Sequence, residues 1–465
     1  MRTGAVTARE IVREGHRLTG GFHLAEDQQA MKLLNQLKNV TPLIELTTGR
    51  RIFRGAIFKR IIVTDPSRGR PYVSARDLVQ AEISPADYLS FRHGDLLNKL
   101  ELKEGMILVT CSGMNLGRAI WTRSDMNGLC ASHDLIRIEP SSQDSTPGYV
   151  YAFLASRFGH VAIRRQIYGG NIKHIEPDQL EQLPVPRFGK AFERKVHALV
   201  VEAASLRAEA SAVLAKARED VARELGAPHV APAGFSTNGV SFNAIRDTRR
   251  LDAFFHNQSA ATLDAWAKRH SNGSWQLHEV ARVFDVPPFK HIYVEAGHGV
   301  PFFTSGDLFD LERGTDKYLS RTQTRDLRRY VLERGWVLLA RSGQLGGIIG
   351  TPQFADSSLE KATTSDHVIR VVPRTDVVPP GYLFAYLSCR GIGYPLLTRT
   401  MTGASVPALW PMYLNNVAVV KASAAFMKKV DHAVQDAFER RVVAGEKDIA
   451  ARRLVEDAIE KEAAN

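Results

Sequence analysis

The chain has 465 residues, of which 44% are apolar and 24% charged. This length corresponds to roughly three domains, and the composition is that of a globular protein that can build sizeable cores. No apolar run approaches the roughly 20 residues of a membrane span, and residues 1–20 contain no apolar segment typical of a signal peptide. The three cysteines, Cys111, Cys130 and Cys389, lack zinc-type spacing and suit a reducing compartment. The sequence therefore predicts a cytoplasmic protein with no metal site.

The formal net charge is +11, from 61 Lys and Arg against 50 Asp and Glu. Such an excess favours a polyanionic partner, because neutralising the phosphates of a nucleic acid releases counterions. A basic protein without such a partner would have the same count, so charge alone leaves both interpretations open.

The chain contains an internal duplication. Residues 104–120 ("EGMILVTCSGMNLGRAI") and 334–350 ("RGWVLLARSGQLGGIIG") share a glycine, an apolar run, Ser-Gly and a further glycine, at an offset of 230. Other blocks match at offsets between 230 and 234: 17–23 with 250–256, 58–63 with 289–294, 70–78 with 300–308, 132–140 with 365–373, 148–157 with 381–390, and 191–196 with 425–430. The period is too long for a solenoid repeat, so the sequence predicts two copies of one domain.

Each copy is predicted to be a mixed α/β domain. The apolar run before each Ser-Gly pair predicts a buried strand, followed by a glycine turn that can bring backbone N–H groups close to a ligand. Residues 134–140 and 367–373 alternate apolar and polar side chains, which predicts half-buried strands. Residues 148–166 predict one helix, and Pro395 is expected to shorten or kink its counterpart. A glycine-containing loop and a strand follow at 168–186 and at 401–420.

A long helix is expected after each domain. Residues 192–225 contain no Gly or Pro, and small or apolar residues recur there at alternating spacings of three and four, which indicates a coiled-coil seam. The expected packing positions of the first helix are Val196, Leu199, Ala203, Leu206, Ala210, Val213 and Ala217. Those of the second helix are Phe438, Val442, Gly445 and Ile449.

The predicted layout follows from these segments. It comprises a first domain with an N-terminal extension at 1–188, a spacer helix at 189–226, a linker at 227–245, a second domain at 246–422 and a second spacer helix at 423–465.

Catalytic signatures are missing. The sequence has no GxxxxGK[ST] loop, no HExxH and no Asn/Asp-Pro-Pro-aromatic tetrapeptide of the kind that holds a flipped base in amino-methyltransferases. The pair His133-Asp134 recurs in reversed order as Asp366-His367, which permits either acid–base chemistry or a structural hydrogen bond at the start of a strand. A non-catalytic binding protein is the simplest interpretation.

This organisation resembles the specificity (S) subunit of type I restriction-modification systems. The resemblance rests on the order of repeated blocks over almost the whole chain: "GMILVTCSGMNLG" and "GWVLLARSGQLGG", "GYVYAFLASR" and "GYLFAYLSCR", the loop "GGNIKHIEPDQLEQLPVP", and the long helix after each domain. The resemblance implies an α+β fold with two target recognition domains and two spacer helices packed as an antiparallel coiled coil.

The resemblance also implies a function in phage defence and DNA methylation. The two recognition domains would read the halves of a bipartite, asymmetric double-stranded DNA target, and the helices would set their separation. They would also hold two copies of an adenine-N6 methyltransferase subunit, with S-adenosylmethionine bound by that partner and no cofactor in this chain. A motor-nuclease restriction subunit can join such complexes.

Candidate DNA contacts are polar residues in the loops where the two copies diverge, since such side chains can read base edges. In the first copy they are Ser112, Asn115, Arg118, Arg164, Arg165, Asn171, Lys173 and His174. In the second copy they are Arg341, Ser342, Gln344, Thr402 and Ser405. Arg164 and Arg165, together with Arg68 and Arg70, are expected to contact phosphates or to be solvated charges.

Three alternatives remain open at the level of the sequence. The chain could be a stand-alone DNA-binding or architectural protein with no methyltransferase partner, an enzyme with methyltransferase or nuclease activity of its own, or a scaffold that binds only proteins.

Overall fold

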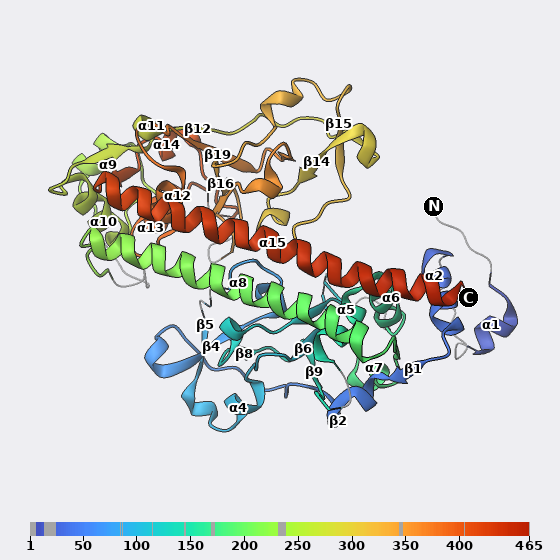
Figure 1. The fold of residues 1–465 in the computed structure, drawn as a ribbon. Coiled ribbons are helices and arrows are strands. Elements are labelled where there is room, and N and C mark those ends of the chain that lie inside the picture. Colours follow the sequence, from blue (N-terminus) through green and yellow to red (C-terminus); the bar gives the residue numbers. More distant parts are fainter. Residues whose placement is uncertain are drawn as a thin grey trace. The chain divides into compact units, whose positions relative to one another are not determined.

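The computed structural model describes residues 6–464 except 14–24, 84, 86, 114, 144–145, 169–172, 231–238, 344–346 and 404. The chain forms two compact units (Figure 1). The first comprises Met1–Ala208 with Val443–Asn465, and the second comprises Glu209–Val442. Each unit contains one α/β domain and parts of both long helices.

The first domain is built on two four-stranded sheets. The larger has the order β2 (Thr47–Arg54), β9 (Leu135–Pro140), β6 (Ile107–Thr110), β7 (Ala119–Trp121) and is antiparallel throughout. The smaller has the order β3 (Ile62–Val63), β5 (Asp87–Ser90), β4 (Gly69–Val73), β8 (Cys130–Ala131), with β4 and β8 parallel. A third pairing joins β1 (Val40–Pro42) to β10 (Pro184–Pro186). The helices are α1 (Ala8–Arg13), α2 (Ala25–Gln36), α3 (Ala75–Leu78), α4 (Leu96–Leu100), α5 (Pro147–Ala155), α6 (Arg157–Arg164) and α7 (Pro177–Glu181).

The second domain repeats this topology strand for strand. Its larger sheet has the order β12 (Ala281–Phe284), β19 (Val368–Pro373), β16 (Val337–Ala340), β17 (Pro352–Phe354). Its smaller sheet has the order β13 (Tyr293–Val294), β15 (Tyr318–Ser320), β14 (Gly299–Phe303), β18 (Thr363–Thr364), again with one parallel pair, and β11 (Ser274–Gln276) pairs with β20 (Ala418–Val420). The helices are α9 (Phe242–Thr248), α10 (Gln258–Lys268), α11 (Leu277–Val280), α12 (Pro380–Ser388), α13 (Gly393–Arg399) and α14 (Pro411–Leu414). The shared topology confirms that the chain contains two copies of one domain.

The strands that precede the Ser-Gly turns are fully buried, as expected from their apolar sequences. The strands β9 and β19 were expected to be half-buried, and this was wrong, because their first four residues are buried in both copies. The polar positions are Arg137 and Arg370, each 0% exposed. Arg137 Nη2 donates to the Ala131 carbonyl at 2.8 Å, and Arg370 Nη2 donates to the Thr364 carbonyl at 3.0 Å. Each arginine thus links the central strand of the larger sheet to the edge strand of the smaller one, and burial lowers the pKa of Arg370 to about 10.

The single helix expected at 148–166 is two helices, α5 and α6, with a break at Ser156. The second copy breaks at the equivalent place, between α12 and α13, so Pro395 lies inside α13 and does not cause the break. A Cβ atom on Gly159 would lie 2.1 Å from the Phe153 carbonyl oxygen. Glycine at this position therefore permits the tight reversal that folds α6 back against α5.

In each domain the core forms around an apolar helix that follows the larger sheet, α5 in the first domain and α12 in the second. In the first unit, α5 packs with the larger sheet, with residues of α8 (Lys190–Glu224) up to Ala204, and with α15 (Ala424–Ala463) from Ala451 onward. In the second unit, α12 packs with the remainder of α8 and with α15 up to Phe438. The N-terminal extension contributes to the first core through α2, which contacts α6, just as α10 contacts α13.

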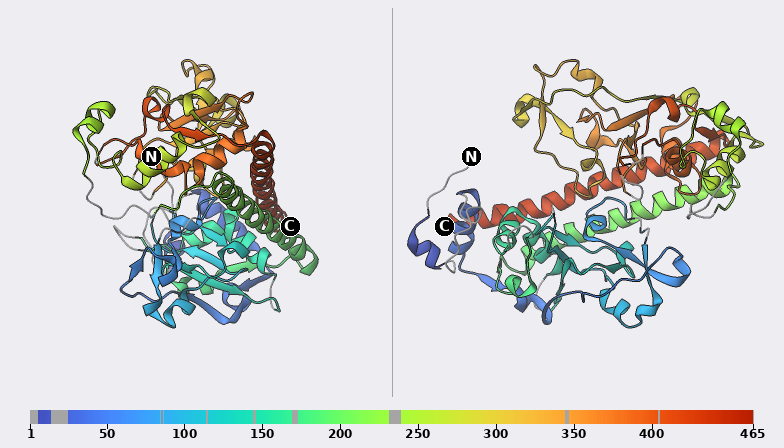
Figure 2. Two further views of the ribbon diagram at one scale, coloured as in Figure 1. Left: turned by 90° about the vertical axis from the view of Figure 1, so that its left-hand side faces the viewer. Right: turned by 180° about the vertical axis from the view of Figure 1, so that it is seen from behind.

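In each unit a segment of α8 therefore packs beside a segment of α15. The first unit contains the beginning of α8 and the end of α15, whereas the second contains the end of α8 and the beginning of α15 (Figures 1 and 2). In the first unit Lys447 Nζ lies 2.9 Å from Glu202 Oε1, and in the second Arg440 Nη1 lies 2.6 Å from Glu209 Oε2.

The buried stripes of these helices keep the expected heptad rhythm. Val196, Ala203, Ala210, Ala217 and Phe438 are buried as predicted, whereas the other predicted positions lie beside buried ones. On α8 the stripe consists of Val196, Val200, Ala203, Arg207, Ala210, Leu214, Ala217 and Val221. On α15 it consists of Val430, Val434, Ala437, Arg441, Ala444, Asp448, Ala451 and Val455. Phe438 is also buried, whereas Leu199, Leu206, Val213 and Val442 are half-buried and Ile449 is 41% exposed. Where the stripe contains a charged residue, as at Arg207, Arg441 and Asp448, the apolar pattern placed the packing position at the neighbouring residue.

Candidate nucleic-acid interface

In each domain the Ser-Gly turn and the later glycine-containing loop lie together. In the first domain the Ile175 amide donates to the Cys111 carbonyl at 3.2 Å, so the end of the later loop is bound to the start of the turn. Gly117, at φ +86°, lies against Ile163 and Arg164 of α6. In the second domain the Gly343 amide donates to the Pro407 carbonyl at 3.3 Å. In each domain the Ser-Gly turn and the later loop, which differ in sequence between the copies, therefore lie together at one end of the larger sheet. Such an arrangement suits a binding surface.

A hydroxyl closes the first turn. Thr110 Oγ1 accepts from the Arg118 amide at 3.0 Å and also donates to the Asn115 carbonyl. These contacts fix the backbone of the turn and leave the side chain of Asn115 exposed. In the second copy Ala340 stands at the position of Thr110, and the Gly350 amide bonds to its carbonyl at 2.9 Å.

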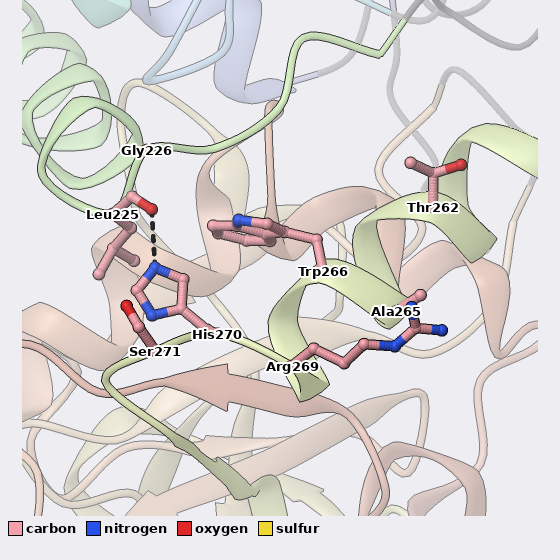
Figure 3. A pocket seen from close by; sticks show the side chains of 8 residues that line it. All are labelled: Leu225, Gly226, Thr262, Ala265, Trp266, Arg269, His270 and Ser271. Carbon is pink, nitrogen blue, oxygen red and sulfur yellow. Dashed lines mark hydrogen bonds between the residues drawn. The ribbon is translucent and has the colours of Figure 1, made fainter.

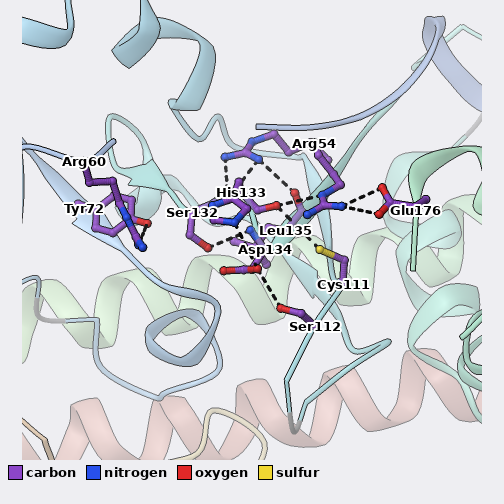
Figure 4. Close-up of polar contacts among 11 residues, drawn as sticks. Arg54, Arg60, Tyr72, Cys111, Ser112, Ser132, His133, Asp134, Leu135 and Glu176 are labelled. Carbon is purple, nitrogen blue, oxygen red and sulfur yellow. Dashed lines mark hydrogen bonds and ion pairs between the residues drawn. The ribbon is translucent and has the colours of Figure 1, made fainter. Parts of the chain in front are cut away.

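The first domain has a polar cluster beside its turn (Figure 4). Ser112 Oγ donates to Asp134 Oδ1 at 2.9 Å. Arg54 donates through Nε to the His133 carbonyl at 3.2 Å and through Nη1 to Glu176 at 2.7 Å. Burial opposes the charge of Arg54, but the hydrogen bond and the charge of Glu176 outweigh it and raise the pKa of Arg54. The cluster therefore places fixed carboxylates beside the turn.

The second domain has different chemistry at the equivalent positions. Strand register aligns Arg54 with Asp285, because Phe53 pairs with Arg137 as Phe284 pairs with Arg370. Asp285 Oδ2 lies 3.4 Å from Arg341 Nη1, so the strand end provides the acidic member of an ion pair here, whereas Arg54 provides the basic member in the first domain.

The Arg341 guanidinium also lies 4.4 Å above the Trp410 ring, whose Nε1 donates to Thr402 Oγ1 at 2.8 Å. Ser342 Oγ lies 3.3 Å from His367 Nδ1. The two turns therefore present different donors and acceptors on the same backbone scaffold.

The remaining candidates of the first domain differ in accessibility. Arg164 and Lys173 are exposed, and Arg118 and His174 are half-buried. His174 and Tyr168 exchange backbone hydrogen bonds at 3.0 and 3.1 Å, which closes the later loop. Arg165 is only 7% exposed, an environment that does not favour a phosphate contact.

Asn171 and Gln344 lie outside the described residues. Ser405 is exposed and Thr402 half-buried. Reasoning from the sequence missed Arg54, Glu176, Asp285 and Trp410 as members of the two clusters. Alignment of the copies would have revealed the change from arginine to aspartate at the end of β2 and β12, within otherwise similar strands.

The second unit also contains an open hollow of about 570 Å³ between the end of α8 and α10 (Figure 3). His270 Nε2 lies 2.9 Å from the Leu225 carbonyl, and its ring meets Trp266 edge to face at 5.3 Å. These contacts indicate a structural role for the histidine. None of the described residues that line the hollow has a carboxylate side chain.

Within the described part of the chain, no group of three or more His, Cys, Asp or Glu side chains is arranged to hold a metal ion. No described helix is long and apolar enough to cross a membrane. Cys111, Cys130 and Cys389 are free and buried.

The fold defines a class of protein: two copies of one α/β domain, each joined to a long helix. No protein-family model matches the chain, and no curated protein matches it. Among solved structures, it is similar to the S subunit of a type I restriction-modification system from M. genitalium, with 14% identity, coverage of 92% of this chain and 96% of that one, and a TM-score of 0.37.

It is also similar to the HsdS subunit from Thermoanaerobacter tengcongensis, with 16% identity, coverage of 91% and 96%, and a TM-score of 0.27. A chain from a structure on complex assembly and conformational transition of the type I R-M system matches at 17% identity, with coverage of 89% and 97% and a TM-score of 0.29.

Proposed function

We propose that this chain is the DNA specificity subunit of a type I restriction-modification system. Each α/β domain would read one half of a bipartite, asymmetric DNA target. The chain would position two copies of an adenine-N6 methyltransferase subunit, which would bind S-adenosylmethionine, and a motor-nuclease subunit would join the complex for restriction.

One observation carries this proposal: two domains of identical topology present different polar side chains at equivalent turns. A carboxylate, Asp134, receives the hydroxyl of the first turn, whereas an imidazole, His367, lies beside that of the second. Donors and acceptors on base edges distinguish the four base pairs in the major groove. Two unlike sets on one scaffold suit a target with two unlike halves.

The long helices support the same function. A helix of 35 residues, such as α8, is about 52 Å long at 1.5 Å per residue. Modules that bind one side of a duplex must be separated by about 34–36 Å or a multiple of it. An antiparallel helix pair is a suitable spacer, and the net charge of +11 suits a polyanionic ligand.

The test is a map of N6-methyladenine in cells that express the chain with its methyltransferase subunits. We expect one bipartite motif, absent from cells without this chain. The double variant Ser112→Ala/Asn115→Ala should relax the motif in one half only, and Thr402→Ala/Ser405→Ala in the other half only. Each lost base contact should reduce discrimination by about 1–3 kcal/mol. Methylation that does not depend on this chain would refute the proposal.

The alternative is a stand-alone DNA-binding protein. It predicts sequence-specific binding by the pure chain, with no methyltransferase recovered alongside it. Methyl transfer from S-adenosylmethionine by the pure chain alone would instead identify an enzyme and would contradict both functions.

A further inference from the structure

The segment that follows β15 is strongly basic and exposed. We call residues 321–329 the arginine segment; it contains Arg321, Arg325, Arg328 and Arg329, all exposed. The side chains of Arg325 and Arg329 are 96% and 71% exposed. The segment leads from the smaller sheet of the second domain toward the larger one (Figure 1).

The first copy lacks this charge. At an offset of 230, its equivalents are Phe91, Asp95, Asn98 and Lys99. Residues 316–334 contain six Lys and Arg against three Asp and Glu, a net charge of +3, whereas residues 86–104 contain three against four, a net charge of −1. The same place on the same fold is therefore basic in one domain and slightly acidic in the other.

The positive charge of the segment is only weakly compensated within the chain. Asp326 Oδ2 lies 4.0 Å from Arg325 Nε and 3.9 Å from Arg329 Nη1, at the limit of an ion pair. All three side chains are solvent-exposed, so water screens these contacts and they contribute little. Among the described residues, no ion pair involves Arg328. Three guanidinium groups are thus available to an external anion.

The backbone of the segment is nevertheless anchored at both ends. Arg321 Nε donates to the Gly299 carbonyl of β14 at 3.1 Å. Tyr330, which follows Arg329, is 5% exposed, and its ring stacks on Phe289 at 3.9 Å with an interplanar angle of 24°. Aromatic stacking of this kind fixes a chain segment firmly. The arginines are therefore exposed side chains on a fixed backbone, which is how proteins position phosphate contacts.

We propose that the arginine segment contacts the phosphate backbone of duplex DNA, and that the equivalent segment of the first domain does not. This inference rests on the proposed function, since it assumes that the chain binds DNA. It adds that this place on the fold provides phosphate contacts in the second domain and none in the first.

The experiment measures binding of the full chain to a 40-base-pair duplex of arbitrary sequence across a series of salt concentrations. Sequence is irrelevant because phosphate contacts do not depend on it. The variant Arg325→Gln/Arg328→Gln/Arg329→Gln should reduce the slope of log K against log[salt] by about 2–3, which corresponds to a roughly 100-fold loss of affinity near 0.15 M salt. Asp326→Asn should raise the affinity.

The matched control is Arg92→Gln/Lys99→Gln/Lys103→Gln in the first domain, which also removes three exposed cations. We expect its slope to change by less than about 1, because the proposal places no DNA phosphate against this segment. Thermal unfolding of all variants checks that they fold.

If the wild-type chain binds DNA and both triple variants lose equal affinity, the proposed difference between the two segments is wrong while the DNA-binding function stands. If the arginine variant binds DNA unchanged but no longer associates with its methyltransferase, the segment is a protein-binding surface and the inference is overturned. A wild-type chain that shows no salt-dependent binding would refute the inference and the proposed function together.

Discussion

A buried ion pair joins the two long helices in the first unit and gives the sharpest test of their packing. Arg207 Nη2 lies 3.3 Å from Asp448 Oδ2, and the two side chains are 8% and 1% exposed. Tyr151 OH of α5 also donates to Asp448 Oδ2, at 3.4 Å. At an effective dielectric constant of about 20, two charges at this distance attract by about 5 kcal/mol. Asp448→Ala removes this attraction and leaves the guanidinium buried without its carboxylate.

We expect Asp448→Ala to lower the free energy of unfolding by about 3–5 kcal/mol, a large part of the roughly 5–15 kcal/mol that stabilises a folded domain. Urea unfolding measures the change, and hydrogen exchange should rise first in residues 196–208 and 443–463. The double variant Arg207→Met/Asp448→Leu replaces the pair by apolar groups and should recover most of the loss.

A neighbouring pair provides the control. Lys447 and Glu202 join the same two helices, but their side chains are 26% and 55% exposed. Water screens such a pair, so Lys447→Ala should change the free energy of unfolding by at most about 1 kcal/mol. Equal effects of Lys447→Ala and Asp448→Ala would refute the reasoning, because burial would then not determine the strength of the contact.

Three further predictions concern stability and reactivity. His197 Nδ1 accepts a hydrogen bond from the Gly148 amide at 3.0 Å, and burial lowers the pKa of His197 below 6.5. As the pH falls, the unfolded state therefore binds the proton before the folded state does. The free energy of unfolding should decrease as the pH falls from about 6.5 toward the pKa of the folded state. His197→Asp, which copies the acceptor Asp431 of the second domain, should abolish this dependence in urea unfolding at pH 5 and 7. Gly159→Ala should destabilise the first domain by about 1–3 kcal/mol or more, since its Cβ would meet a carbonyl of α5 at 2.1 Å; a melting temperature equal to wild type would contradict this. Burial raises the pKa of the Cys111 thiol to about 11, so an aromatic disulfide reagent should label it only after unfolding, as counted by released thiolate.

The repeat was predictable from the sequence because the residues that form the fold are retained in both copies. The apolar strands before the Ser-Gly turns and the apolar helices α5 and α12 recur with nearly constant spacing. Short-range apolar periodicity reports such elements well, since it depends only on which side chains are buried.

The errors arose where polar residues are buried. Arg137 and Arg370 gave β9 and β19 an alternating pattern that is typical of a half-exposed strand, although their guanidinium groups are satisfied by carbonyls of the neighbouring sheet. Arg207 and Asp448 similarly displaced two predicted packing positions to Leu206 and Ile449, because neither residue is recognisable as a packing position until its partner on the other helix is known. Pairings of this kind join residues far apart in the chain, and no local pattern encodes them.

Some residues that hold the fold together are retained in both copies, whereas residues beside the turns differ. The arginines that link the two sheets are retained in both copies. The first turn of α5 and that of α12 each donate a backbone amide to a side chain of a long helix, which is His197 in the first copy and Asp431 in the second. At the strand end beside the turn, by contrast, Arg54 is replaced by a residue of opposite charge, Asp285, and each has acquired its own partner. The two domains therefore place different charged groups beside equivalent turns, and this is where the proposed base recognition should be tested first.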